Sequence, residues 1–243
     1  MATVRMVLEY DGTNFVGWQV QPNGRSVQEE VERAARQILQ RPVSVIGGGR
    51  TDAGVHALGQ VGSFQVEGSV DVHALIRGMN SLLPEDVVVR SLVLAPDTFH
   101  ARYSALERRY TYCIRRRPTA VQRQYCWQLF YTLDVERMQE CAALLVGERD
   151  FGSFCKADAE VKHTICTVTR ANWTSADELL EFRISANRFL YGMVRALVGT
   201  MVDVGRGYSS VDDFRRILTA CDRKAAGMSA PAKGLFLEEI VYR

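Results

Sequence analysis

The sequence predicts an α+β fold made of two split β-α-β (ferredoxin-like) halves with mainly antiparallel sheets. Two observations lead to this class. The N-terminal part shows strand and helix patterns in the order β-α-β-β-α-β, and the remainder shows a second series of such elements without repeating the sequence. With 243 residues, 47% of them hydrophobic, the chain can bury a core in each half. We therefore expect an N-terminal subdomain at 1–104 and a C-terminal subdomain at 105–243.

Alternating apolar residues predict four strands in the first half, which span 3–10, 43–46, 58–66 and 87–94. Capping residues predict two helices between them. The first begins at Ser26, with Glu29 three positions later as in a capping box, and the second begins at Asp71. Pro42 and Pro84 are expected to end these helices, because proline cannot continue the backbone hydrogen bonding.

The second half shows the same kinds of signals. Its expected strands span 109–115, 166–173, 178–185 and 235–242. Helices are predicted from Asp134 to Gly147, over the apolar stretch 188–204, and from Ser210, which has Asp213 three positions later. We expect the sheets of the two halves to be joined around a central active-site cleft.

Basic residues are concentrated in one segment although the net charge is only +2. Residues 101–125 contain one acid, Glu107, and seven arginines, which are Arg102, Arg108, Arg109, Arg115, Arg116, Arg117 and Arg123. Interleaved tyrosines, Tyr103, Tyr110 and Tyr112, make the segment typical of a nucleic acid interface. The alternative is a solvated charged surface without a partner.

The six cysteines contain no C-x-x-C pair and mostly lie in apolar runs. This pattern argues against a zinc site and a disulfide framework, and it indicates reduced core residues. The first ten residues lack the apolar run of a signal peptide, and no segment is long and apolar enough to span a bilayer. We therefore expect a cytoplasmic protein. Cys155, Lys156 and His163 lie in a polar loop, where ordinary surface contact is expected.

The stretch 47–57, Gly-Gly-Gly-Arg-Thr-Asp-Ala-Gly-Val-His-Ala, is the first candidate for chemistry. Its glycines relax the steric limits on the backbone, and a turn at Asp52 would project a carboxylate. The spacing does not match a dinucleotide or phosphate loop. The alternative is a turn in which Asp52 only bonds its own backbone.

Arg195 is the second candidate, because it lies in a predicted helix that is apolar nearly all round. A buried guanidinium needs an acidic partner, since an unpaired buried charge is very costly. Asp52 is one candidate partner. Alternatively, the side chain extends along its aliphatic stem to the surface.

Residues 49–57 resemble the signature of the tRNA pseudouridine synthase A family. Three further stretches resemble other motifs of the family and occur in the same order along the chain. They are Tyr10-Asp11-Gly12-Thr13 with Phe15, Gly17 and Trp18, residues 99–112, and residues 189–195. Two positions depart from the family pattern. Gly192 stands where a larger polar residue is frequent, and Ala232 stands where a second proline is frequent. Neither departure touches a proposed catalytic group.

The resemblance implies specific roles. Asp52 matches the catalytic nucleophile, Tyr110 matches the tyrosine that stacks on the target base, and Arg195 matches the arginine that pairs with the catalytic aspartate. Arg50 would help to handle the flipped nucleotide, and further substrate contacts are expected from Arg102, Arg108 and Arg109. The expected reaction converts uridine to pseudouridine at positions 38–40 of the tRNA anticodon stem-loop. The resemblance also implies a homodimer that holds each tRNA across both subunits. The reaction needs no metal, nicotinamide or ATP, so no cofactor is expected.

Two other functions compete with this interpretation. A non-catalytic RNA-binding protein would also suit split β-α-β units with basic aromatic strands. A hydrolase could use Asp52 with His56 or His100, although the four histidines form no metal-binding pattern. Two routes for a synthase also stay open at this point. Asp52 either forms a covalent bond to the sugar or base, or it abstracts a sugar proton to give a glycal.

Overall fold

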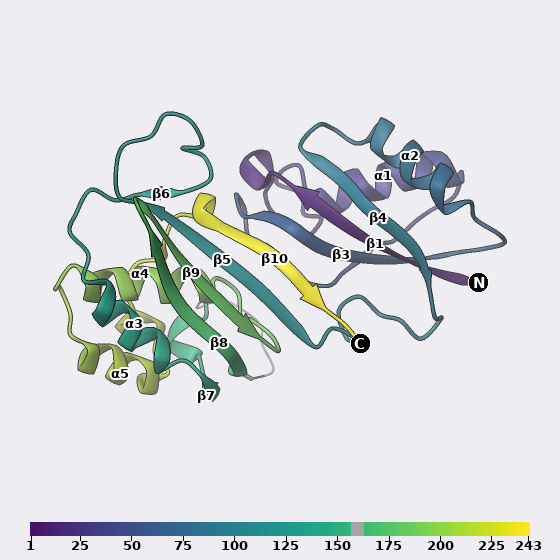
Figure 1. The fold of residues 1–243 in the computed structure, drawn as a ribbon. Helices are drawn as coiled ribbons and strands as arrows, with labels where there is room; N and C mark the ends of the chain where they lie inside the picture. The colour runs from purple at the N-terminus through teal and green to yellow at the C-terminus, as the bar shows by residue number, and fades with distance from the viewer. Residues whose placement is uncertain (157–162) are drawn as a thin grey trace. The chain divides into compact units, whose positions relative to one another are not determined.

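The computed structural model describes residues 1–156 and 163–243. Residues 157–162, which form most of the predicted polar loop, lie outside the described part. The chain forms two compact units (Figure 1). The first unit comprises Met1–Leu106 together with Phe236–Arg243, and the second comprises Glu107–Leu235. None of the helices in the described residues has the length and apolar character needed to cross a membrane.

The first unit contains a mainly antiparallel sheet with the strand order β4-β1-β3-β10, and β2 pairs with β3. The strands are β1 (Ala2–Tyr10), β2 (Ile46–Gly47), β3 (His56–Val66), β4 (Val87–Ala95) and β10 (Leu235–Val241). β10 pairs with β3 in parallel. Helices α1 (Val27–Leu39) and α2 (Val72–Leu82) pack against each other, and α2 packs against β4 (Figure 1). The strand predicted at 3–10 is confirmed, and one of its faces lies in the core, because Val4, Met6 and Leu8 are fully buried.

The second unit contains an antiparallel sheet with the order β5-β9-β8-β7, and the short β6 pairs with β5 in parallel. The strands are β5 (Glu107–Arg115), β6 (Trp127–Gln128), β7 (Gly147–Asp150), β8 (Ile165–Ala176) and β9 (Leu179–Ala186). Helices α3 (Val135–Ala143), α4 (Met193–Gly205) and α5 (Val211–Ala220) pack together, and α3 also packs on β8 (Figure 1). The predicted fold class, α+β with mainly antiparallel sheets, is confirmed.

The predicted helix starts are confirmed where a side chain caps the helix. Ser26 accepts a hydrogen bond from the Glu29 backbone, and Asp71 accepts two from the first turn of α2. Ser210 and Asp213 form a reciprocal capping box at α5. These caps are local, because they satisfy backbone donors within the same turn.

The proposed domains at 1–104 and 105–243 stay a prediction.

The strand predicted at 43–46 is wrong except at its last residue. The Val45 N–H donates to Glu32 Oε1 at 2.8 Å, and the Val45 carbonyl accepts from Gln28 Nε2 at 3.1 Å. Two side chains of α1 therefore take the hydrogen bonds that a neighbouring strand would otherwise make. Pairing with β3 begins only at Ile46.

Two predicted helices have different bounds. α3 ends at Ala143, and the chain then turns at Gly147, with φ of 104°, into the unpredicted strand β7. α4 begins at Met193 and not at Arg188, because Gly192 has φ of 72°. A left-handed residue cannot continue a right-handed helix, so hydrophobicity alone predicted a helix that begins too early.

All six cysteines are free in the structure. Cys126, Cys141 and Cys166 are buried, whereas Cys221 is exposed and so departs from the predicted core location. Cys155 is also buried, so the surface role expected for it is wrong. It follows directly after a turn of 3-10 helix at Gly152–Phe154, whose Phe154 is fully buried.

Candidate functional site in two parts

Asp52 lies in a short connection between β2 and β3 in the first unit. Its backbone forms an isolated bridge with Gly17, and its carbonyl accepts the Val55 N–H at 3.1 Å. Gly54, inside this turn, has φ of 75°. The Asp52 side chain is half-buried and Arg50 is exposed. The connection thus holds a carboxylate and a guanidinium two residues apart at the surface of one unit.

A buried network fixes the residues that precede Asp52. The Tyr10 hydroxyl lies 2.8 Å from Thr51 Oγ1, and Gln60 Nε2 donates to the Tyr10 oxygen at 3.3 Å. Gln60 also bonds both backbone groups of Gly49, accepting from its N–H at 3.2 Å and donating to its carbonyl at 2.8 Å. Burial raises the pKa of Tyr10 to about 12, so its hydroxyl stays protonated at neutral pH. Because the network is buried and hydrogen-bonded, it restricts the position of the Asp52 backbone.

The loop at 15–18 holds the same segment from another side. The Trp18 N–H donates to the Thr51 carbonyl at 3.1 Å, and the Gly54 N–H donates to the Phe15 carbonyl at 3.2 Å. Gly17 has φ of 116°, and a Cβ there would fall 2.6 Å from the Thr51 oxygen. Only glycine fits this close approach of two backbones. The opening motif therefore supports the Asp52 turn directly.

His56 and His100, the two histidines that a hydrolase could use, accept hydrogen bonds from nearby backbone N–H groups. His56 is buried and stacks on Phe236, with 4.8 Å between ring centroids. Its Nδ1 lies 3.1 Å from the Gly12 N–H and 3.0 Å from Asp11 Oδ1. His100 Nδ1 accepts two backbone N–H groups in its own turn. These contacts give both rings a structural role and weigh against the hydrolase.

Tyr110 lies on β5 in the second unit, directly opposite Ile184 of β9. Its ring is buried and meets Phe189 edge-on, at 5.0 Å between centroids and 81° between planes. The structure thus brings together two residues of separate motifs, 79 positions apart. Neighbouring Arg108 donates to the Asn187 carbonyl at 2.7 Å, and Arg109 donates to Glu107 at 2.8 Å.

Arg195 is half-buried on α4 in the second unit. Its Nε donates to the Ala230 carbonyl at 2.7 Å, and its own carbonyl accepts the Ala230 N–H at 2.9 Å. The same segment passes α4 at Gly199, where a Cβ would fall 1.8 Å from the Met228 carbonyl oxygen. Burial raises the pKa of Tyr112, while the nearby Arg195 charge acts to lower it. Arg195 is therefore held by backbone contacts and does not simply extend into solvent.

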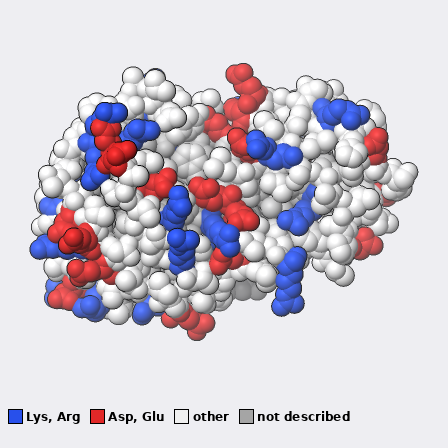
Figure 2. Space-filling model, viewed as in Figure 1, with Lys and Arg blue, Asp and Glu red and all other residues white. Residues whose placement is uncertain are grey.

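Charge in the basic segment is partly neutralised. Arg109 and Arg117 pair with Glu107 and Glu178, and Arg116 donates to Ser175 Oγ at 2.9 Å. On the face shown in Figure 2, basic and acidic side chains are intermingled. Arg102, in the first unit, is exposed. The segment is thus not uniformly basic, because neighbouring glutamates neutralise two of its arginines.

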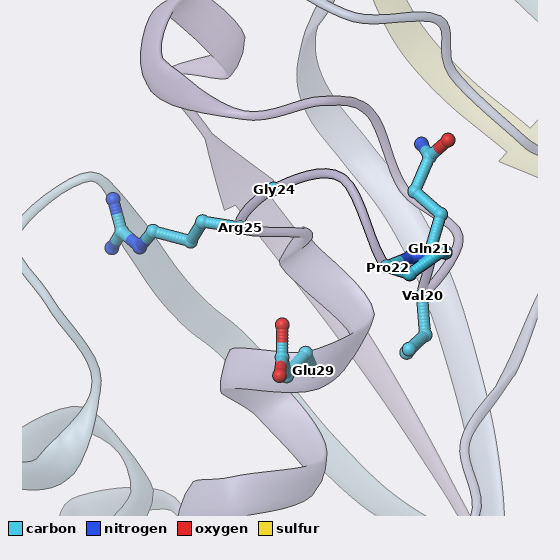
Figure 3. A pocket seen from close by; sticks show the side chains of 6 residues that line it. All are labelled: Val20, Gln21, Pro22, Gly24, Arg25 and Glu29. Atoms are coloured by element: carbon cyan, nitrogen blue, oxygen red, sulfur yellow. The ribbon is translucent and has the colours of Figure 1, made fainter.

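A shallow hollow in the first unit lies apart from the predicted site residues. It is lined by Val20, Gln21, Pro22, Gly24, Arg25 and Glu29 (Figure 3). Arg25 binds both carboxylate oxygens of Asp86 at 2.9 Å and lies 4.3 Å from the Phe15 ring centroid. Its charge is therefore used within the fold, and we assign no function to the hollow.

Sequence reasoning missed Tyr10 and Gln60 as parts of the site. A signal for Gln60 was present, because it is a polar residue inside the long apolar strand β3, and it is fully buried. Buried polar side chains need hydrogen-bond partners, so such a residue points to a network. The partners could not be identified without the strand register.

Comparison with known proteins agrees with the motifs. The family model described as tRNA pseudouridine synthase matches residues 6–104 and 141–243. A tRNA pseudouridine synthase A of Exiguobacterium sibiricum is 41% identical over 100% of this chain and 97% of its own length. One from Bacteroides fragilis is 45% identical over 97% of this chain and 94% of its own. A chain of a solved Cbf5-Nop10-Gar1 complex aligns with a TM-score of 0.41 at 12% identity, over 96% of this chain and 48% of that one, which is too distant to bear on function. By the family match and the full-length identity, this chain belongs to the tRNA pseudouridine synthase family.

Proposed function

We propose that this protein isomerises uridine to pseudouridine in tRNA, at positions 38–40 of the anticodon stem-loop. One observation carries the proposal. In a chain of this family, Asp52 stands half-buried on a turn whose preceding residues are fixed by the Tyr10–Thr51–Gln60 network. A fixed carboxylate suits this chemistry, because the attacking or proton-accepting oxygen must be held close to the sugar.

The reaction exchanges one bond for another at the same sugar carbon. The bond from C1′ to uracil N1 breaks, and a bond from C1′ to uracil C5 forms. The proton on C5 is lost, and N1 gains a proton, so there is no net oxidation. Asp52 would either attack as a nucleophile or remove the C2′ proton to give a glycal. Both roles need an ionised carboxylate at the start.

The remaining roles are proposed from the family motifs. Tyr110 stacks on the target base after it leaves the helix, which recovers part of the cost of unstacking. Its edge contact with Phe189 supports this role by restricting the ring. Arg195 keeps the catalytic carboxylate ionised, and the hydrogen bond from its Nε to the Ala230 carbonyl restricts the guanidinium. Arg50, exposed two residues before Asp52, contacts the flipped nucleotide, while Arg102, Arg108 and Arg109 contact phosphates.

The assembly and location are proposed on the same basis. The protein works as a homodimer in the cytoplasm, and each tRNA is held by both subunits. Light scattering at micromolar concentration tests the homodimer, and a monomeric mass under conditions of full activity would contradict it. The free state of all six cysteines supports a reducing compartment.

The decisive experiment incubates wild type and Asp52→Asn with an unmodified tRNA transcript, without metal or nucleotide. Glu85→Gln, at an exposed turn position of the first unit, is the control. We expect pseudouridine in the anticodon arm with wild type and the control, and none with Asp52→Asn, whose tRNA affinity and melting temperature should be nearly unchanged. Product from Asp52→Asn would remove Asp52 from the mechanism. Binding without product from wild type would favour a non-catalytic RNA-binding protein.

Deuterium at C2′ of the target uridine separates the two routes. A glycal requires the C2′ bond to hydrogen to break, so single-turnover isomerisation should slow by a primary isotope effect. A covalent adduct at C1′ or at the base leaves that bond intact, so the rate should be nearly unchanged.

A further inference from the structure

The turn at 96–104 in the first unit is fixed to its sheet through one buried residue. Ala101 is fully buried. Its N–H donates to Ser63 Oγ at 3.2 Å, and its carbonyl accepts the Tyr242 hydroxyl at 2.6 Å. The residues on either side of Ala101 therefore have a defined position although they lie at the surface.

His100 organises the exposed part of this turn. Its Nδ1 accepts the N–H groups of Arg102 and Tyr103, both at 3.2 Å, and its own N–H donates to Ser104 Oγ at 3.1 Å. Its ring also packs on the Tyr103 ring, with 4.3 Å between centroids and 31° between planes. Tyr103 is 77% exposed. An aromatic ring is thus held in one orientation while most of its surface faces solvent.

The turn packs directly on the segment that leads to Asp52. A Cβ on Gly48 would fall 3.0 Å from the Ala101 carbonyl oxygen and 2.7 Å from the Tyr242 hydroxyl, so the two backbones are in contact. Asp52 follows Gly48 by four residues, which limits their separation to about 14 Å. Tyr103 follows Ala101 by two. A chain of a few nucleotides can span such a distance.

We propose that Tyr103, with Arg102 beside it, is a stacking platform for an unpaired base of the RNA near the uridine on which Asp52 acts. This inference rests on the proposed function. Bases stack on aromatic rings, and a guanidinium close to the ring can meet the adjacent phosphate. The Arg102 guanidinium lies 5.8 Å from the Tyr103 ring centroid, which places both groups within reach of one nucleotide. His100 acts as a positioning residue, because it fixes the ring and does not touch the base.

Binding of an unmodified tRNA transcript tests the platform with three variants of the full chain. Tyr103→Ala should weaken binding by about 5- to 160-fold, the range for loss of one base stack, whereas Tyr103→Phe should stay within about 2-fold of wild type. Tyr208→Ala is the matched control. Tyr208 is also 71% exposed and has a guanidinium, that of Arg206, 4.1 Å from its ring centroid, but it lies outside the turn at 96–104 and outside the proposed site residues. We expect Tyr208→Ala to bind as wild type does.

His100→Ala separates positioning from chemistry. It should raise KM for tRNA several-fold and leave kcat nearly unchanged, with a melting temperature close to that of wild type. A transcript with 4-thiouridine in the anticodon loop should also crosslink to Tyr103 on irradiation and lose that crosslink in His100→Ala.

Affinity and product formation are measured separately, so two failures can be told apart. Unchanged affinity in Tyr103→Ala, or an equal loss in Tyr208→Ala, would overturn the platform while wild type still forms pseudouridine. Absence of pseudouridine with wild type would overturn the proposed function. Even then, a loss of tRNA affinity in Tyr103→Ala that is absent from Tyr103→Phe and Tyr208→Ala would still support stacking of RNA on the Tyr103 ring.

Discussion

Tyr10→Phe tests whether the buried network holds the Asp52 turn. The substitution removes only the hydroxyl, so the ring keeps its packing and no large cavity forms. In wild type, the Tyr10 hydroxyl is hydrogen-bonded to Thr51 Oγ1 at 2.8 Å and accepts a hydrogen bond from Gln60 Nε2 at 3.3 Å. Both Thr51 and Gln60 are buried. A buried polar group that loses its partner costs about 1–3 kcal/mol. For a chain of this size, 1 kcal/mol lowers Tm by roughly 2–4 °C, so we expect a decrease of about 2–12 °C.

Differential scanning calorimetry measures this shift, and single-turnover pseudouridine formation measures its effect on the site. The rate should fall, because Thr51 is the residue before Asp52. Tyr191→Phe is the control, since Tyr191 is 47% exposed and loss of its hydroxyl should change Tm very little. A Tyr10→Phe protein with the Tm and the rate of wild type would refute the argument that this network positions Asp52.

Two further predictions concern the same region. Gly17→Ala should lower Tm and reduce the rate of pseudouridine formation, because φ of 116° costs an L-residue about 1–3 kcal/mol and its Cβ would meet the Thr51 oxygen at 2.6 Å. Alkaline pH should destabilise the fold through Tyr10. Burial raises its pKa from 10.0 to about 12, so between these values the folded state keeps a proton that the unfolded chain has lost. Stability should therefore be unaffected by this group below pH 10 and fall by about 1.4 kcal/mol per pH unit between pH 10 and about 12.

Each of these predictions has a control. Gly68 also has a left-handed φ, of 74°, but open space around its Cβ position, so Gly68→Ala should leave the rate unchanged. If both glycine variants lose activity equally, close approach to Thr51 is not the cause. Urea unfolding from pH 9 to 12 should show a smaller loss of stability in Tyr10→Phe than in wild type, and parallel curves would contradict the assignment to Tyr10.

The sequence predicted those parts of the fold that depend on neighbouring residues. Helix caps at Asp71 and Ser210 were predicted correctly, because side chain and backbone lie in one turn. The strand at 43–46 was wrong because Gln28 and Glu32, on a helix, take the hydrogen bonds of Val45. Likewise, the apolar periodicity predicted a helix that continues through Gly192. This was wrong because periodicity contains no information about φ.

The candidate site was predictable only in part for a related reason. The turn at Asp52 is encoded locally by Gly54 and by the residues around it. The support from Tyr10 depends on the register of β1 against β3, where Leu8 pairs with Gln60 and an irregularity follows before Tyr10. Such a register is a property of two strands some 50 residues apart, so no local pattern reveals it.

The parallel strand β10 has a consequence for protein synthesis. Residues 236–243 belong to the first unit, and they supply Phe236, which stacks on His56, and Tyr242, which bonds Ala101. While the chain is being translated, the N-terminal residues leave the ribosome long before these partners exist. The surroundings of the Asp52 turn can therefore be completed only after residue 242 has emerged, so a stalled or truncated chain does not contain a finished first unit.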